Sequence, residues 1–196
     1  MTAKNILITG GAGFIGTRLA LQLIEKGHKI TILDNLSPQI HGSAETSVLY
    51  QEIKDKVNFI LGDVQNKSDW ELAMKDQQVI IHLAAETGTG QSMYQIERYS
   101  NVNVSGTSIL LDLLTNTKHK IEKVIVASSR AIYGEGKYYS PSLNQSVYPL
   151  GRTEEDMLKG DFEVKCPITG ENAIMEKTDE ASRIQPNSIY GLTKYY

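Results

Sequence analysis

Asn5-Ile-Leu-Ile-Thr-Gly-Gly-Ala-Gly-Phe-Ile-Gly16 is the stretch that decides the fold. Its apolar, β-branched first part predicts a strand, and the glycines then lead into a helical pattern. Because Gly10 and Gly13 have no Cβ, the backbone can turn sharply there and a pyrophosphate can approach it closely. Gly16, one turn into the helix, lets that helix pack against the strand. The stretch therefore predicts a dinucleotide site, with phosphate oxygens at the N–H groups of a helix N-terminus.

The composition is that of an ordinary globular protein. A chain of 196 residues predicts one domain, and a net charge of −3 gives no basic face for nucleic acid. The single cysteine, Cys166, cannot form an intrachain disulfide, which fits a reducing cytoplasm. No apolar run approaches the roughly 18 residues of a membrane span, and the first strand leaves no room for a signal peptide. We therefore expect a cytoplasmic protein without nucleic-acid or membrane partners.

Strand-like and helix-like patterns alternate along the first 127 residues. Ile15, Leu19 and Leu23 recur at four-residue spacing, which predicts one apolar helix face. After the first strand, the further expected strands are Lys29 to Leu33, Val57 to Leu61, Val79 to Leu83 and Lys123 to Ala127. Small or polar residues follow each of these runs. The alternation predicts an α/β fold, a doubly wound parallel sheet of the Rossmann type, with its ligand across the carboxyl ends of the strands.

Asp34 follows the second expected strand, 18 positions after Gly16 (34 − 16). This is near the distance at which an acidic residue reaches the adenosine ribose of a dinucleotide. A carboxylate there accepts hydrogen bonds from both ribose hydroxyls and repels a 2′-phosphate, so it predicts NAD rather than NADP. The alternative is a surface aspartate that merely follows a strand.

Three further segments carry weaker or less regular patterns. Ser68-Asp-Trp-Glu71 predicts a capping box at the start of a short helix. From about 135 to 182 no period persists, apart from a brief helical pattern at Glu154 to Leu158, and so long an irregular insert is either functional or loosely ordered. A helical pattern returns between Pro186 and Lys194.

Tyr190 and Lys194 stand four residues apart, so on a helix both project from the same face. A cation within about 4–6 Å lowers the pKa of a phenol from its ordinary value near 10. The pair therefore predicts a tyrosine that accepts a proton from a substrate hydroxyl. Ser129, just past the fifth expected strand, is placed to hydrogen-bond a substrate oxygen. Taken singly, each of these residues is also common on ordinary helix faces and turns.

Other chemistries fit the sequence poorly. A Ser–His–acid hydrolase lacks its Gly-x-Ser-x-Gly elbow. We expect no metal site, because the histidines are scattered and none has a ligand-like spacing to Cys166. Cys166-Pro-Ile-Thr-Gly170 is interpreted as a turn.

Several spaced motifs together carry a resemblance to a known family. They are Thr9-Gly-x-x-Gly13-x-x-Gly16, Asp34, Asp63-Val64, His82-Leu-Ala-Ala85, Asn103-Val-Ser-Gly-Thr107, Ser128-Ser129 and Tyr190-x-x-x-Lys194. With them the chain resembles the extended short-chain dehydrogenases/reductases, specifically the NAD-dependent sugar-nucleotide epimerases and dehydratases. The resemblance covers nearly the whole chain in order.

The resemblance implies a role for each residue of these motifs. Pyrophosphate contacts are expected from Gly10, Gly13, Phe14, Ile15 and Gly16. Asp34 and Asn35 are expected at the adenosine ribose, Asp63 and Val64 beside the adenine, and Leu83, Ala84, Ala85 and Thr87 along the cofactor. Asn103 is expected at the cofactor, where it also supports the active site. The implied catalytic set is Ser129, Tyr190 and Lys194. Tyr190 and Lys194 are also expected to bind the cofactor, with Lys194 holding the nicotinamide ribose.

Finer features favour one reaction within this family. The 4,6-dehydratases carry Asp-Glu after the catalytic Ser or Thr, whereas Arg130-Ala131 stands here, so dehydration is disfavoured. Glu86 to Tyr94, Ser128 to Gly136 and the insert around Cys166 look similar to dTDP-L-rhamnose 4-epimerases, which often have a second cysteine where Thr169 stands. The implied reaction is epimerisation at C4 of a nucleoside-diphosphate sugar through a transient 4-keto sugar. The alternatives are another oxidoreductase or dehydratase of the family, or a non-catalytic NAD-binding protein.

The resemblance also bears on how complete the chain is. Family members continue past the Tyr-Lys helix with further strands and a C-terminal sugar-nucleotide domain. We therefore expect 1–196 to be a NAD-binding Rossmann domain that is incomplete at its C-terminal end. Epimerase activity and a homodimer are expected of a full-length parent, and the 196 residues alone are expected to be poorly stable and inactive.

Overall fold

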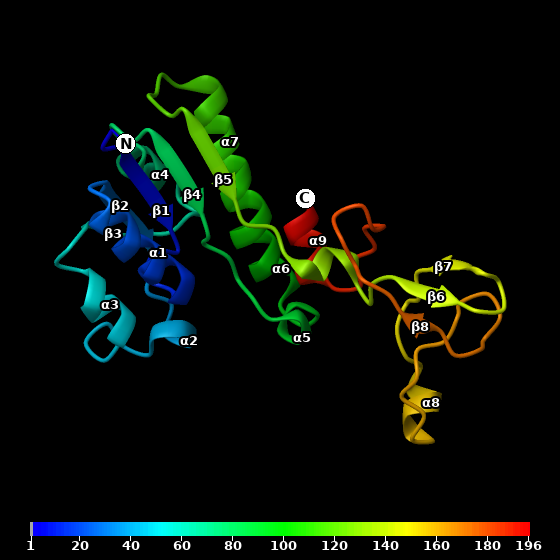
Figure 1. The fold of residues 1–196 in the computed structure, drawn as a ribbon. Coiled ribbons are helices and arrows are strands. Elements are labelled where there is room, and N and C mark those ends of the chain that lie inside the picture. The colour runs from blue at the N-terminus through cyan, green and yellow to red at the C-terminus, as the bar shows by residue number, and fades with distance from the viewer. Residues whose placement is uncertain (1) are drawn as a thin grey trace. The chain divides into compact units, whose positions relative to one another are not determined.

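The structure is a computed structural model and describes residues 2–196. It divides into two compact units (Figure 1). Unit 1 comprises the described residues up to Glu86 together with Glu97–Ala127, and unit 2 comprises Thr87–Ile96 and Ser128–Tyr196.

Unit 1 contains a parallel five-stranded sheet. The strands are β1 (Asn5–Thr9), β2 (Lys29–Asp34), β3 (Asn58–Leu61), β4 (Val79–His82) and β5 (Lys123–Val126). Their order is β3-β2-β1-β4-β5, so β1 is central and Ile8 is in register with Ile32 on one side and Ile81 on the other. This order, with crossovers to both sides of β1, confirms the predicted doubly wound α/β sheet.

The helices of unit 1 form two layers around the sheet. They are α1 (Phe14–Glu25), α2 (Pro38–His41), α3 (Val48–Ile53), α4 (Lys67–Ala73), the π-helical η1 (Ser100–Ser105) and α7 (Gly106–Asn116); the short α6 (Ile96–Tyr99) begins at the unit boundary. Successive strand residues face opposite layers: Leu7 belongs to the core with α4 and α7, whereas Ile6 and Ile8 belong to the core with α1 and α3. Both cores are apolar, as expected of strands covered on both faces.

The start of α4 differs from the prediction. The helix begins at Lys67 with Asn66 as its N-cap, so Ser68 lies inside it and the predicted capping box is wrong. The carboxylate of Asp69 instead accepts hydrogen bonds from the backbone N–H of Asp63 at 2.8 Å and from Asn66 Nδ2 at 3.2 Å. Asp69, which the predicted capping box placed within the helix start, therefore stabilises the turn after β3.

Unit 2 contains regular structure in the segment that was expected to be irregular. A three-stranded antiparallel sheet has the order β7-β6-β8, and the elements are α5 (Thr89–Ser92), η2 (Arg130–Tyr133), β6 (Tyr138–Ser140), β7 (Gln145–Val147), α8 (Glu154–Leu158), β8 (Ile174–Met175) and α9 (Ile189–Tyr195). Strands of two or three residues are too short for an alternating pattern to show in the sequence. The helix predicted at Glu154 to Leu158 is confirmed, and Thr153 caps it by accepting from the N–H of Asp156.

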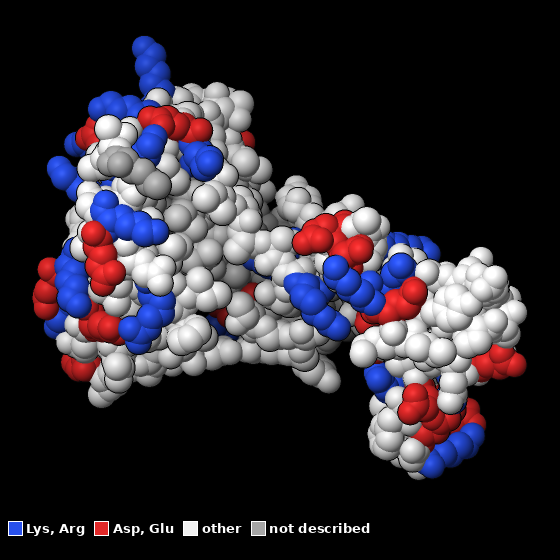
Figure 2. Space-filling model, in the orientation of Figure 1, with Lys and Arg blue, Asp and Glu red and all other residues white. Residues whose placement is uncertain are grey.

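The surface carries charges of both signs. On the face shown in Figure 2, acidic and basic side chains are interspersed over each unit. Among residues 2–196, no helix is long and apolar enough to cross a membrane.

Candidate functional site

The glycine turn between β1 and α1 depends on close backbone approach. Gly10 has a φ of 65°, and a Cβ there would lie 2.7 Å from the backbone nitrogen of Ala84. A Cβ on Gly16 would lie 2.5 Å from the Cα of Gly11, so α1 could not start where it does. The two glycines are thus needed to fit the turn against the end of β4 and against its own helix.

The first turn of α1 fits an anionic ligand. Gly13 is the N-cap and offers no side chain to the free N–H groups, while Phe14 and Ile15 are 73% and 67% exposed. Uncapped N–H groups at the start of a 12-residue helix, with the positive end of its dipole, suit a phosphate group. The residues present therefore fit the pyrophosphate of a dinucleotide.

Asp34 is buried at the end of β2. Its Oδ2 accepts from the backbone N–H of Ala12 at 3.0 Å, and its Oδ1 accepts from that of Leu36 at 2.9 Å. His41 Nε2 lies 3.7 Å from Oδ1. The carboxylate thus joins the glycine turn to the loop after β2, and it is not the surface aspartate of the alternative interpretation. An ionised carboxylate has about four acceptor sites, so it retains capacity for hydroxyl groups of a ligand.

Asn35, which directly follows Asp34 in the sequence, contacts another predicted residue, Asp63. Asn35 Nδ2 donates to Asp63 Oδ2 at 2.9 Å, which joins the ends of β2 and β3. Val64 is buried in the core with Trp70, whose indole N–H donates to its carbonyl oxygen at 2.7 Å. The structure therefore places Asn35 and Asp63 together at the surface and assigns the Val64 side chain to packing.

A polar network fixes the segment after β4. The amide of Asn103 clamps Glu86: its Oδ1 accepts from the Glu86 N–H at 2.8 Å, and its Nδ2 donates to the Glu86 carbonyl at 3.1 Å. Between this clamp and the glycine turn, His82 lies between two threonine hydroxyls, Thr9 at 2.6 Å from Nδ1 and Thr107 at 3.1 Å from Nε2. The predicted residues Leu83, Ala84 and Ala85 lie on the backbone that this network holds.

The proton positions in this network follow from donor counting. Thr107 donates its hydroxyl to the Asn103 carbonyl at 2.6 Å, so His82 Nε2 must carry the proton that the Thr107 oxygen accepts. His82 Nδ1 then accepts from Thr9, whose oxygen in turn accepts from the N–H of Ala84 at 3.2 Å. Every hydroxyl is satisfied when His82 is neutral. The sequence reasoning used His82 only as part of a motif and missed this positioning role.

The predicted catalytic residues all lie in unit 2, on two elements that are bonded together. Ser129 caps η2, with its Oγ accepting from the Ala131 N–H at 3.1 Å, so its own hydroxyl proton is free to be donated to a substrate oxygen. Ser128 Oγ donates to the carbonyl of Lys194 at 3.1 Å. The backbone N–H of Tyr190 donates to Ser92 Oγ at 3.0 Å, which ties α9 to α5.

A glycine inside the Tyr-Lys spacing permits this arrangement. A Cβ on Gly191 would lie 2.6 Å from the carbonyl oxygen of Ala131, so only glycine allows α9 to pack this closely against η2. A Cβ on Gly134, whose φ is 59°, would collide with the carbonyl of Gln185. Burial lowers the pKa of Lys194 below its ordinary value, because desolvation disfavours the ammonium.

The Cys166 segment is a turn, as predicted. The N–H of Gly170 donates to the Cys166 carbonyl at 2.9 Å, and Thr169 hydrogen-bonds the sulfur. Hydrogen bonds, chiefly from Thr169, lower the pKa of the thiol to about 7, although the residue is only 2% exposed and burial opposes ionisation. Within residues 2–196, no three or more His, Cys, Asp or Glu side chains form a group that could hold a metal ion.

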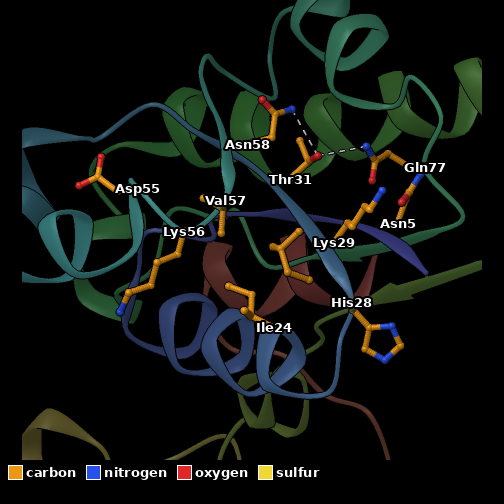
Figure 3. A pocket seen from close by; sticks show the side chains of 11 residues that line it. Asn5, Ile24, His28, Lys29, Thr31, Asp55, Lys56, Val57, Asn58 and Gln77 are labelled. Atoms are coloured by element: carbon orange, nitrogen blue, oxygen red, sulfur yellow. Dashed lines mark hydrogen bonds between the residues drawn. The ribbon is translucent and has the colours of Figure 1, made fainter. Parts of the chain in front are cut away.

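A cavity of about 540 Å³ lies at the amino ends of strands in the unit 1 sheet (Figure 3). His28 and Lys29 line it at the start of β2, and Thr31 accepts hydrogen bonds there from Asn58 Nδ2 at 3.4 Å and Gln77 Nε2 at 3.1 Å. It contains none of the predicted site residues. Ligands of open α/β sheets bind at the carboxyl ends of the strands, so this cavity at their amino ends is distinct from the candidate site.

Residues 6–155 match the NAD dependent epimerase/dehydratase family. The chain belongs to this family. The dependence of this family on NAD confirms the predicted cofactor, and the match agrees with the glycine turn and parallel sheet described above.

Individual relatives agree with this assignment. The chain is 37% identical over 195 residues, 97% of its length, to a dTDP-L-rhamnose 4-epimerase of Burkholderia thailandensis, of which it covers 51%. It is 34% identical over 159 residues, 77% of its length, to a bifunctional UDP-glucose and UDP-xylose 4-epimerase of Arabidopsis thaliana, of which it covers 44%. Among solved structures, a UDP-glucose 4-epimerase of Brucella ovis in complex with NAD aligns with 98% of the chain and 45% of its own, at 28% identity and a TM-score of 0.62. The chain spans about half the length of the curated relatives it matches.

Proposed function

We propose that the protein is an NAD-dependent 4-epimerase of a nucleoside-diphosphate hexose, with dTDP-L-rhamnose or a similar sugar as substrate. The observation that carries the proposal is the packing of α9 against η2, which joins Ser129 to the element bearing Tyr190 and Lys194. The identity of 37% to a dTDP-L-rhamnose 4-epimerase over nearly the whole chain supports this reaction and sugar. We also propose a homodimer for the full-length protein.

Unit 1 supplies the groups for the cofactor. The proposed contacts are the α1 N-terminus for the pyrophosphate, Asp34 and Asn35 for the adenosine ribose, Asp63 and the backbone of Val64 for the adenine, and Leu83 to Ala85 along the cofactor. From unit 2, Thr87 and Lys194 are assigned to the cofactor as well. When bound, NAD supplies a reversible acceptor for the hydride of the sugar C4–H bond.

The chain's own residues handle the proton. Tyr190 accepts the proton of the C4 hydroxyl, and Ser129 donates a hydrogen bond to the C4 oxygen. Lys194, in a partly buried position one helical turn after Tyr190, supplies the positive charge that assists this proton transfer. After the 4-keto sugar has presented its other face, Tyr190 returns the proton to the C4 oxygen, and the configuration at C4 is inverted.

Dehydration is disfavoured by the residues that follow Ser129. Elimination of water needs an acid and a base beside the keto sugar, and η2 begins with Arg130 and Ala131 at those positions. Neither an alanine methyl group nor a guanidinium that stays protonated takes a proton at neutral pH.

Tyr190→Phe tests the proposal. Epimerisation of dTDP-L-rhamnose is measured with the full-length protein, for which the activity is proposed. Loss of the proton acceptor should lower kcat by about 100- to 10,000-fold and leave NAD bound. Tyr195→Phe is the matched control, since Tyr195 lies on the same helix and is 57% exposed. Unchanged turnover in the Tyr190 variant would overturn the assignment, and so would an equal loss in the control.

A further inference from the structure

Three buried side chains, those of Asp34, His41 and Ser47, form a row. His41 Nε2 lies 3.7 Å from Asp34 Oδ1, and His41 Nδ1 lies 2.9 Å from Ser47 Oγ. The side chains of Asp34 and His41 are 7% and 4% exposed. A histidine so thoroughly buried beside an acidic residue is fixed in place by its neighbours on both sides.

Donor counting assigns the protons of this row. Ser47 Oγ accepts from the N–H of Tyr50 at 3.4 Å as the cap of α3, so its hydroxyl proton is available for His41 Nδ1. The proton of the neutral ring then lies on Nε2, the atom that faces Asp34. Since an ionised carboxylate only accepts, this is the arrangement in which the contact is favourable.

The loop after β2 is shaped to bring His41 back to Asp34. Leu36 has a φ of 50°, unusual for a residue with a side chain, and its N–H donates to Asp34 Oδ1. The N–H of His41 then donates to the Ser37 carbonyl at 3.0 Å, which closes the short α2. The same three residue types serve hydrolases, but Ser47 is only 6% exposed and bonded as a helix cap, so it offers no nucleophile to a substrate.

We propose that His41 is a positioning residue for cofactor recognition, acting through Asp34. The imidazole ring, held by Ser47, packs beside the carboxylate with Nε2 3.7 Å from Oδ1. This contact limits the positions that the carboxylate can take, so that its remaining acceptor sites meet the adenosine ribose hydroxyls. This inference rests on the proposed role of Asp34 in the NAD site. The 36–47 loop then contributes to recognition of the adenosine ribose hydroxyls.

The test measures binding of two ligands, NAD and its analogue without the adenosine 2′-hydroxyl, to the 196-residue chain by calorimetry. His41→Leu should weaken NAD about fivefold and the analogue less than twofold, because the lost contact acts through the ribose hydroxyl. His41→Gln keeps an N–H near the Nε2 position and should restore affinity for NAD to within about twofold. His28→Gln, at the opposite end of β2 (Figure 3), is the matched control and should change neither affinity.

Each remaining outcome decides one of the two claims. If His41→Leu weakens both ligands equally, or His41→Gln fails to rescue, the residue has only a structural role and the inference is wrong. Where His41→Leu does not fold, His41→Asn replaces it, because asparagine reaches Ser47 but falls short of Asp34. Asp34→Asn separates the proposed function: if it leaves the preference for NAD over the analogue unchanged, Asp34 does not bind the ribose, whatever His41 does.

Discussion

The two units are built by different means. Unit 1 has an apolar core on each face of a parallel sheet, and Leu7, Ile8 and Ile32 are wholly buried there. Unit 2 has a smaller buried apolar cluster, formed by Tyr138, Val147, Val164, Cys166 and Ala173. What holds its predicted catalytic residues is a close backbone approach at Gly191 and a few hydrogen bonds. Unit 1 therefore depends on burial, and unit 2 on individual contacts.

The largest expected loss of stability comes from adding one methyl group at a close backbone contact in each unit. Gly16→Ala places a Cβ 2.5 Å from the Cα of Gly11, and Gly191→Ala places one 2.6 Å from the Ala131 carbonyl. Each should cost about 3 kcal/mol, with hydrogen exchange increasing mainly in its own unit. Gly90→Ala is the control, since a Cβ there meets nothing within 4 Å, and it should be nearly neutral. Equal exchange in both units of either variant would contradict the division.

Shortening a buried apolar side chain should destabilise the protein more in unit 1 than in unit 2. Leu7→Ala should lower the free energy of unfolding by about 3 kcal/mol, because Leu7 is fully buried in unit 1. Val164→Ala, in the small core of unit 2, should cost about 1 to 2 kcal/mol. Chemical denaturation of the two variants measures both values. A larger loss for Val164→Ala would show that unit 2 relies on burial after all.

The burial of Lys194 should lower the stability of the folded protein. Because burial lowers its pKa, the folded protein binds this proton less tightly than the unfolded chain, so stability rises with pH between the folded and unfolded pKa values. Below the folded pKa the penalty is fully present. Lys194→Met should therefore raise stability at pH 7, by less than about 1 kcal/mol because the group keeps contact with solvent, and should remove that alkaline increase. Denaturation curves across this pH range measure the effect, and a loss of stability at pH 7 would contradict it.

The smallest expected effect concerns a single hydrogen bond in unit 2. Thr169→Val removes the bond that chiefly lowers the pKa of Cys166 to about 7, so the pKa should rise and the thiolate fraction at pH 7 should fall. Thiolate absorbance in the ultraviolet, followed against pH, measures the shift. Ser142→Ala is the comparison, because Ser142 hydrogen-bonds the hydroxyls of Thr169, at 3.4 Å, and Ser140, at 3.2 Å, rather than the sulfur, and it should change the titration less than Thr169→Val does.

Most of unit 1 could be predicted from the sequence, and less of unit 2. The five strands and their parallel arrangement follow from apolar runs and from small residues at the strand ends. The insert could not be predicted, because β8 has only two residues and β6 only three. The capping box at Ser68 was wrong because Asp69 bonds the backbone N–H of Asp63 across the preceding turn, a partner that the motif does not specify.

By itself the sequence determined the fold class, the NAD-dependent family and the glycines that this cofactor class needs, because strand, turn and helix signals are local in the chain. Only the tertiary structure decided what supports the site. His82 bridges Thr9 and Thr107, His41 faces Asp34, and Gly191 meets Ala131. The partners in these contacts are separated by 7 to 73 positions, and which side chains meet across such a separation depends on how the elements pack rather than on any local pattern.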